Sequence, residues 1–115
     1  MPAFILYLGL LLTSISMSAQ QSIEGVWDTG QENTKIEITN NLGKIYSSDN
    51  KMATVGKIMI KELIKTNNTY KGKLYLVRRN RWVDAVFIPK GNSLTVTISA
   101  GWQSKTLKWN FVKKS

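Results

Sequence analysis

The chain has 115 residues, enough for one domain, and it contains no Cys and no His. These absences exclude disulfides, a thiolate nucleophile and the usual zinc ligands, and they remove the commonest general base. Sixteen Lys and Arg against seven Asp and Glu give a net charge of +9, which favours contact with anions such as phosphate groups or acidic polysaccharide. The alternative, which we favour, is that single lysines along strands provide solubility and protect sheet edges.

The first element in chain order is an uncharged N-terminal segment. Residues 4–12 form an apolar run of signal-peptide length, and small and polar residues follow it at 13–19. We expect a signal peptide over residues 1–19, cleaved after Ala19, and a mature domain over residues 20–115 that is secreted or periplasmic. The alternative is an uncleaved membrane anchor, although a spanning helix needs about 20 apolar residues. Because no Cys lies near the cleavage region, a lipid-anchored lipoprotein is excluded.

Short runs of alternating polar and apolar residues, each ended by turn residues, follow over the rest of the chain. Such runs are typical of strands joined by hairpins. Because Asn tolerates a positive φ, Asn40–Asn41 predicts a tight hairpin turn. The stretch 56–65 fits either a strand or a helical turn. The other strands are expected at residues 25–28, 35–39, 42–47, 70–77, 82–88, 93–100 and 104–112.

This spacing predicts an all-β fold, a single antiparallel up-and-down meander of about eight strands that closes into a small barrel. Closure pairs the first strand with the last and removes the edges that a helix-free domain would otherwise expose. Gly25 lets the backbone approach closely at this point, and Trp27 and Trp109 are expected to seal it.

The opening Gly25-x-Trp27 resembles the start of lipocalin-type barrels, so we expect the barrel to be lipocalin-like. Four further motifs resemble the small exported bacterial β-proteins of domain-of-unknown-function family 2147: GKIY at 43–46, GKLY at 72–75, LTV at 94–96 and KTLKW at 105–109. The family usually has Gly-Arg before the Thr of the last motif, where this chain has Ser-Lys, so the resemblance is to a divergent member. It implies a small β-barrel of the cell envelope and no established reaction.

The residues that enzymes need are largely missing. The chain has no phosphate-binding glycine loop and no nucleophile elbow, and its seven carboxylates are scattered. We therefore expect no catalytic residue, no metal site and no cofactor, and we expect that the protein is not an enzyme.

One polar pair is a candidate for the barrel interior. Asp84 shares its parity with Trp82, Val86 and Ile88, so a carboxylate would lie inside if that face points inward. Lys105 is its natural partner. The pair is either structural or a polar anchor for a ligand in an apolar pocket.

A second candidate is an anion-binding cluster, formed by Arg78, Arg79 and Arg81 beside Trp82. These are the only arginines of the chain, and guanidinium groups suit phosphate and carboxylate. The alternative is a solvated hairpin turn. Trp102 follows Gly101 in a turn and is the indole most expected to be exposed.

Two functions are compatible with these features. The first is an envelope structural or interaction protein, a monomer whose basic surface contacts anionic lipid or polysaccharide and not nucleic acid. The alternative is a lipocalin-like binding module for a small apolar or amphipathic ligand. The side chains expected inside are bulky and favour a filled interior: Ile36, Ile38, Ile45, Ile58, Ile60, Leu74, Leu76, Val86, Ile88, Leu94, Val96, Ile98, Leu107, Trp109 and Phe111.

Overall fold

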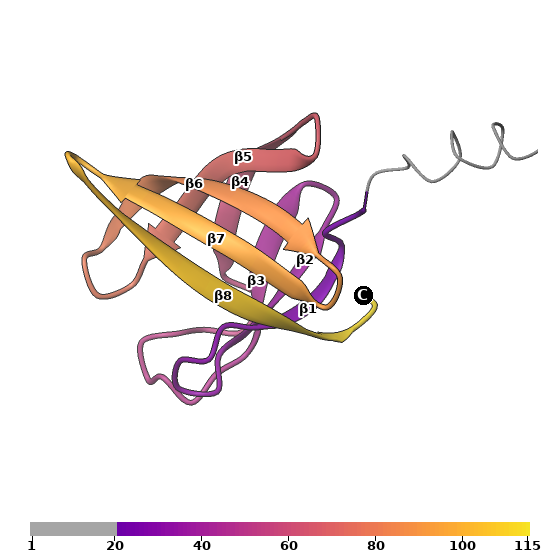
Figure 1. Ribbon diagram of the computed structural model, residues 1–115. Helices are drawn as coiled ribbons and strands as arrows, with labels where there is room; N and C mark the ends of the chain where they lie inside the picture. Colours follow the sequence, from indigo (N-terminus) through magenta and orange to yellow (C-terminus); the bar gives the residue numbers. More distant parts are fainter. Residues whose placement is uncertain (1–20) are drawn as a thin grey trace, which may run out of the picture.

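The computed structural model describes residues 21–115, and these residues form a β-barrel without a helix (Figure 1). The prediction of an all-β meander of eight strands is confirmed. The strands are β1 (Gly25–Asp28), β2 (Lys35–Thr39), β3 (Leu42–Ser47), β4 (Ile58–Thr66), β5 (Thr69–Leu76), β6 (Arg81–Lys90), β7 (Ser93–Ala100) and β8 (Gln103–Lys113).

Each strand pairs antiparallel with its neighbours in sequence, and β1 pairs with β8, so the sheet is a closed barrel. Short connections favour this up-and-down order. At the β2–β3 turn, Asn40 and Asn41 have φ angles of 53° and 64°. These are the left-handed conformations that a tight two-residue hairpin turn requires, as expected from the two asparagines.

The stretch that fitted either a strand or a helical turn is the strand β4. Its register with β5 shifts between Lys61 and Ile64, and Glu62 within this bulge has a φ of 54°. Because the bulge adds a residue, Ile60 and Leu63 both point into the core although they are three positions apart. That spacing is also the spacing of one helical face, which is why the sequence was ambiguous.

The interior of the barrel is a single cluster of apolar side chains. Alternation along each strand carries every second side chain inward. The buried cluster consists of Ile23, Trp27, Ile36, Ile38, Ile45, Met59, Ile60, Leu63, Tyr70, Leu74, Val83, Ala85, Phe87, Leu94, Val96, Ile98 and Trp109.

Strand β6 corrects one prediction about the interior. Val83 and Phe87 lie in the core, so the opposite parity, which includes Asp84, points out of the barrel. The Asp84 side chain is 72% exposed and forms an ion pair with Lys73 of β5. The predicted interior pair of Asp84 with Lys105 is therefore wrong. Because β6 is apolar on both faces, its alternation could not identify the inward face.

The same parity places Val86 and Ile88 on the outer face of β6, where both are half-buried. Ile58, at the start of β4, is also on the outside and is 40% exposed. These three side chains were expected inside. On the outer face, the hydrogen bond and the charge of Asp84 raise the pKa of Lys73 above its ordinary value of 10.5.

The closure of the barrel depends on a close approach of β1 to β8. Gly25 has a φ of 141°, and a Cβ atom at this position would lie 2.7 Å from a ring carbon of Phe111. The Trp27 ring packs edge-on against the same Phe111, with 5.3 Å between the ring centroids. Trp109 is buried as expected, but it contacts Phe87 of β6. The aromatic partner of Trp27 at the closure is therefore Phe111.

The two ends of the barrel differ. One end, here called the mouth, carries the β1–β2, β3–β4, β5–β6 and β7–β8 connections. The other, here called the plugged end, carries the remaining three connections and the start and end of the described chain (Figure 1). Ile23 fills it, and its carbonyl accepts a hydrogen bond from Trp27 Nε1 at 2.9 Å. The Gln21 carboxamide pairs with both backbone groups of Gly91, at 2.7 and 3.1 Å.

The expected signal peptide at 1–19 lies outside the described residues. Of the residues that the structure describes, none belongs to a helix long and apolar enough to cross a membrane.

Candidate binding pocket

The mouth opens into a pocket of about 630 Å³. Its volume lies within the range of about 300–1,000 Å³ that is usual for small-molecule sites. The pocket is bordered by strands β2 to β5, β7 and β8 and by the loops of the mouth.

The deep part of the pocket is apolar. The Trp109 ring lies at its base and packs against Phe87, with 6.1 Å between the centroids. Phe87 belongs to the filled part of the barrel, so this aromatic pair marks the boundary between the packed half and the hollow half. The apolar border of the pocket consists of Ile36, Ile45, Met59, Leu74, Leu76, Ile98, Leu107 and Trp109.

The side chains nearer the mouth are small. Thr34, Ala53, Ala100 and Ser104 all border the pocket at this level. The expected filled interior is therefore found only between Trp109 and the plugged end. The list of bulky inward positions did not reveal the small residues at this level, which leave space beside Leu76.

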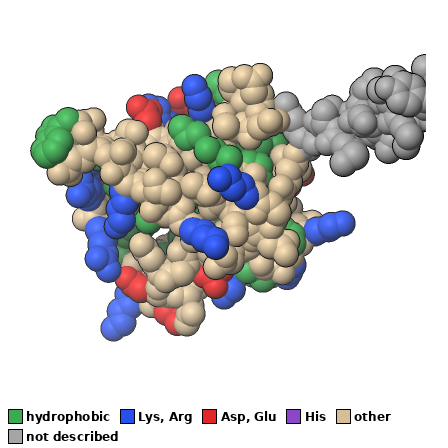
Figure 2. Space-filling view, viewed as in Figure 1, with side chains coloured by type: hydrophobic (Ala, Val, Ile, Leu, Met, Phe, Trp, Pro, Cys, Tyr) green, Lys and Arg blue, Asp and Glu red, His purple; other side chains and the backbone are tan. Residues whose placement is uncertain are grey.

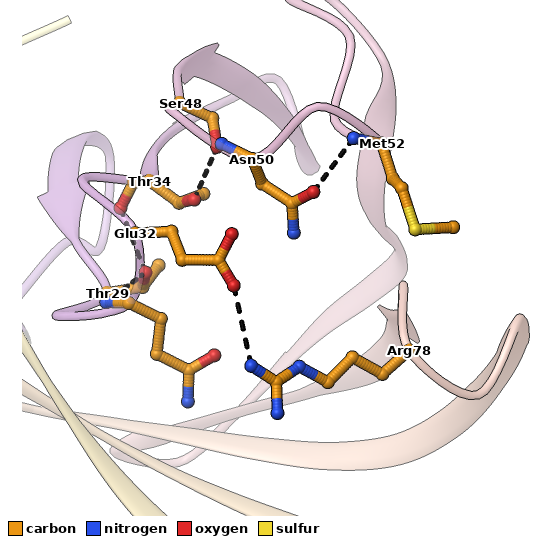
Figure 3. A network of polar contacts seen from close by, with 8 residues as sticks. Thr29, Glu32, Thr34, Ser48, Asn50, Met52 and Arg78 are labelled. Atoms are coloured by element: carbon orange, nitrogen blue, oxygen red, sulfur yellow. Dashed lines mark hydrogen bonds and ion pairs between the residues drawn. The ribbon is translucent and has the colours of Figure 1, made fainter.

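Polar contacts tie three of the mouth loops together (Figure 3). The hydroxyls of Thr34 and Ser48 lie 2.6 Å apart, which joins the β1–β2 and β3–β4 loops. The backbone N–H of Asp49 donates to the Glu32 carbonyl at 2.9 Å. The Glu32 carboxylate in turn accepts a hydrogen bond from the Arg78 guanidinium in the β5–β6 turn at 3.4 Å. The first two contacts join the β1–β2 and β3–β4 loops, and the exposed Arg78–Glu32 pair adds a weaker link to the β5–β6 turn.

The charged side chains that border the pocket are mostly basic. Arg78, Arg79 and Lys105 line it, against the single carboxylate of Glu32. Lys105 lies opposite Ile98 in the β7–β8 register, on the inward parity that the sequence predicted for it. Lys105 therefore lies at the rim of the pocket. Its expected partner Asp84 is not there, because Asp84 lies on the outer face of β6.

The predicted anion-binding cluster is divided by the barrel wall. Arg78 and Arg79 border the pocket from the β5–β6 turn. Arg81 begins β6, and Trp82 lies on the outer face. There the Trp82 ring packs edge-on against Tyr75, with 5.3 Å between the centroids, and Lys61 Nζ lies 4.3 Å from its centroid. The structure therefore brings together two of the four predicted residues at the pocket.

Sequence reasoning missed Glu32 as a rim residue. Glu32 and Arg78 are 46 positions apart, so no local pattern joins them. The only signal was the polar, turn-forming composition of the β1–β2 loop, where Glu32 and Asn33 both adopt a positive φ.

Within residues 21–115, no group of three or more Asp, Glu, His or Cys side chains is placed to hold a metal ion. The chain matches no protein-family model, no curated protein and no solved structure. The fold and the pocket define an eight-stranded antiparallel barrel that is packed at one end and hollow at the other. Membership of domain-of-unknown-function family 2147 stays a prediction.

Proposed function

We propose that the protein is a non-enzymatic binding module for a small amphipathic molecule with an anionic end. The observation that carries this proposal is the pocket of about 630 Å³, apolar at its base and basic at its rim. Pockets of this kind bind through apolar walls and are oriented by a few polar groups.

The base of the pocket supports an apolar tail. Burying one methylene contributes about 0.8 kcal/mol, so a tail of about eight methylenes contributes roughly 6 kcal/mol before the cost of association. Leu76 and Leu107 lie along the path of such a tail from the rim to Trp109. A dissociation constant of 1 μM requires about 8 kcal/mol net, so contacts of the rest of the ligand have to add to those of the tail.

The rim supports the anionic end. Arg79 and Lys105 border the pocket, and within residues 21–115 neither of them forms an ion pair. Guanidinium and ammonium groups both suit a carboxylate or phosphate. Because these side chains are near solvent, we expect the contact to select an orientation more than to add affinity.

Catalysis has little support at this site. Glu32 is the only carboxylate that borders the pocket, and it is paired with Arg78. A single paired carboxylate, without His or Cys in the chain, does not provide an acid and base couple.

The test is binding of dansyl-labelled undecanoic acid and of its methyl ester, followed by dansyl fluorescence. We expect saturable binding of the acid in the micromolar range and weaker binding of the ester. Leu76→Trp places an indole in the pocket and is expected to weaken binding at least about tenfold, because the tail loses its space.

The matched control is Val86→Trp, which enlarges a half-buried strand residue on the outer face. Its binding should equal that of the wild type. Equal weakening by both variants, or no saturable binding of the acid, contradicts the proposal.

We also propose that the protein is exported and cleaved near Ala19, as the uncharged N-terminal segment predicts. N-terminal sequencing of protein recovered from outside the cytoplasm tests this. A start at Gln20 is the expected result, and an intact Met1 contradicts it.

A further inference from the structure

Large hydrophobic side chains are exposed at the mouth. Trp102, at the tip of the β7–β8 hairpin, is 90% exposed, as the sequence predicted for this turn. Val55 and Met52, both in the β3–β4 loop, are 69% and 68% exposed. Figure 2 shows hydrophobic side chains at the tip of the β7–β8 hairpin, with Lys and Arg side chains along the same edge of the molecule.

The fold does not require these side chains. The β7–β8 turn needs one residue with a positive φ, and Gly101 supplies it at 66°. An indole at the next position packs into no core. An indole is partly apolar and partly hydrogen-bonding, and aromatic residues of this kind are enriched where a protein meets a partner or a membrane interface.

The mouth is also basic. Its two acidic loop residues already have partners, since Glu32 pairs with Arg78 and Asp49 accepts a hydrogen bond from Asn33 at 2.6 Å. The basic residues of the mouth loops are Lys51, Lys57, Arg78 and Arg79, and the adjoining strands add Lys35, Arg81 and Lys105 together with one carboxylate, that of Asp28.

The turns of the plugged end are different. Their residues are Asn40–Asn41, Asn67–Asn68 and Gly91–Asn92, all of them polar or small and none of them charged. Both ends of the barrel carry basic residues, since Lys65, Lys90 and Lys113 lie at the strand ends of the plugged side. The mouth differs in that its loops themselves carry basic groups and large exposed apolar side chains, Trp102 above all.

We infer that the mouth docks on a lipid bilayer with anionic headgroups. Trp102 enters the interfacial region, where indoles are enriched because one part of the ring is apolar and the N–H stays hydrated. Arg79 and Lys51 contact the headgroup phosphates, each basic residue near such a surface contributing about 1 kcal/mol. A hydrated acidic polysaccharide would attract the basic groups, but it offers no apolar region into which the exposed apolar side chains could transfer. A lipid surface offers both the negative charge and the apolar region.

This inference goes beyond the proposed binding function, and it indicates where the protein would meet its ligand. A docked mouth opens the pocket directly onto the bilayer, which is the source of amphipathic molecules. The two proposals can fail separately, because docking is measured without a pocket ligand and pocket binding is measured without lipid.

The test is co-sedimentation of the purified protein with vesicles of equimolar phosphatidylcholine and phosphatidylglycerol, and with vesicles of phosphatidylcholine alone. We expect binding to the anionic vesicles only, weakened by salt. Trp102→Ser should reduce the partition coefficient roughly tenfold, because the indole loses its transfer into the interface. Bromine-labelled acyl chains should quench the fluorescence of the wild type and not that of Trp102→Ser.

The matched control is Ile64→Ser, which removes an apolar side chain of 65% exposure from a strand end on the plugged side. This variant should bind like the wild type. Equal loss in both variants, absence of vesicle binding, or binding to acidic polysaccharide without binding to anionic vesicles overturns the inference. None of these variants touches the core, so circular dichroism should show an unchanged fold.

Discussion

The mouth and the plugged end are built from the same strands, yet they use their residues differently. At the plugged end Ile23 is 1% exposed, and the Gln21 carboxamide is matched to the backbone of Gly91. At the mouth, small residues such as Ala100 leave space in the last inward layer, and Trp102 and Val55 lie in solvent. The side chains of the plugged end extend the packed core. Those of the mouth are less densely packed, and they leave a pocket and exposed side chains that are free to bind.

The difference indicates that stability and binding are separated along the barrel axis. Residues between Trp109 and Ile23 bury apolar surface, and they should set the free energy of unfolding. Only the exposed residues of the mouth loops should tolerate substitution without unfolding the domain, because several side chains that border the pocket, such as Ile36 and Leu74, also belong to the buried core.

The largest effect is expected at the boundary between the two halves. Trp109→Ala removes a buried indole that packs on Phe87, and it should lower the free energy of unfolding by about 3–5 kcal/mol. Urea denaturation followed by circular dichroism measures this. Trp102→Ala is the matched indole at the mouth and should stay within about 0.5 kcal/mol of the wild type. If the urea midpoint of Trp109→Ala equals that of the wild type, Trp109 is not part of the packed core and does not separate it from the pocket.

The next effect compares the two ends directly. Ile23→Ala opens the plug and should cost about 2 kcal/mol, the lower end of the usual range for such a core truncation, because the segment lies near the chain start. Val55→Ala at the mouth should cost nothing measurable. The same urea experiment compares them. If both variants unfold at the wild-type midpoint, the N-terminal segment does not contribute to the core.

The smallest effect is expected on the outer face, away from both ends. Asp84 raises the pKa of Lys73 above 10.5, so the ion pair stabilises the folded state most fully below pH 10.5. This contribution is lost as the pH rises through the raised pKa. Lys73→Met should therefore differ slightly from the wild type at neutral pH, and the difference should vanish in strongly alkaline buffer. A difference that grows with pH would contradict this assignment.

The sequence predicted the strand order and the closed barrel because hairpin turns and alternation are local signals. Two adjacent asparagines, Asn40 and Asn41, are enough to predict a tight turn, and the alternation within β7 is enough to predict which of its side chains point inward. The inward face of β6 was not predictable, because both of its faces carry large apolar residues, and only the packing of Val83 and Phe87 in the closed barrel distinguishes them.

The pocket was not predictable for a related reason. Its volume depends on the space enclosed by the closed sheet at one level, and no single strand specifies that space. Arg78 was identified from the composition of its turn. Glu32 was not, because the two loops meet only after the barrel has closed.

The chain enters the described barrel at Gln21 and leaves it after β8, and both points lie at the plugged end (Figure 1). A group joined to the C-terminus therefore begins on the side opposite to the mouth. A C-terminal tag can anchor the protein to a sensor surface with its pocket facing the solution. The same polarity would let a fusion partner report on binding without standing in the path of the ligand.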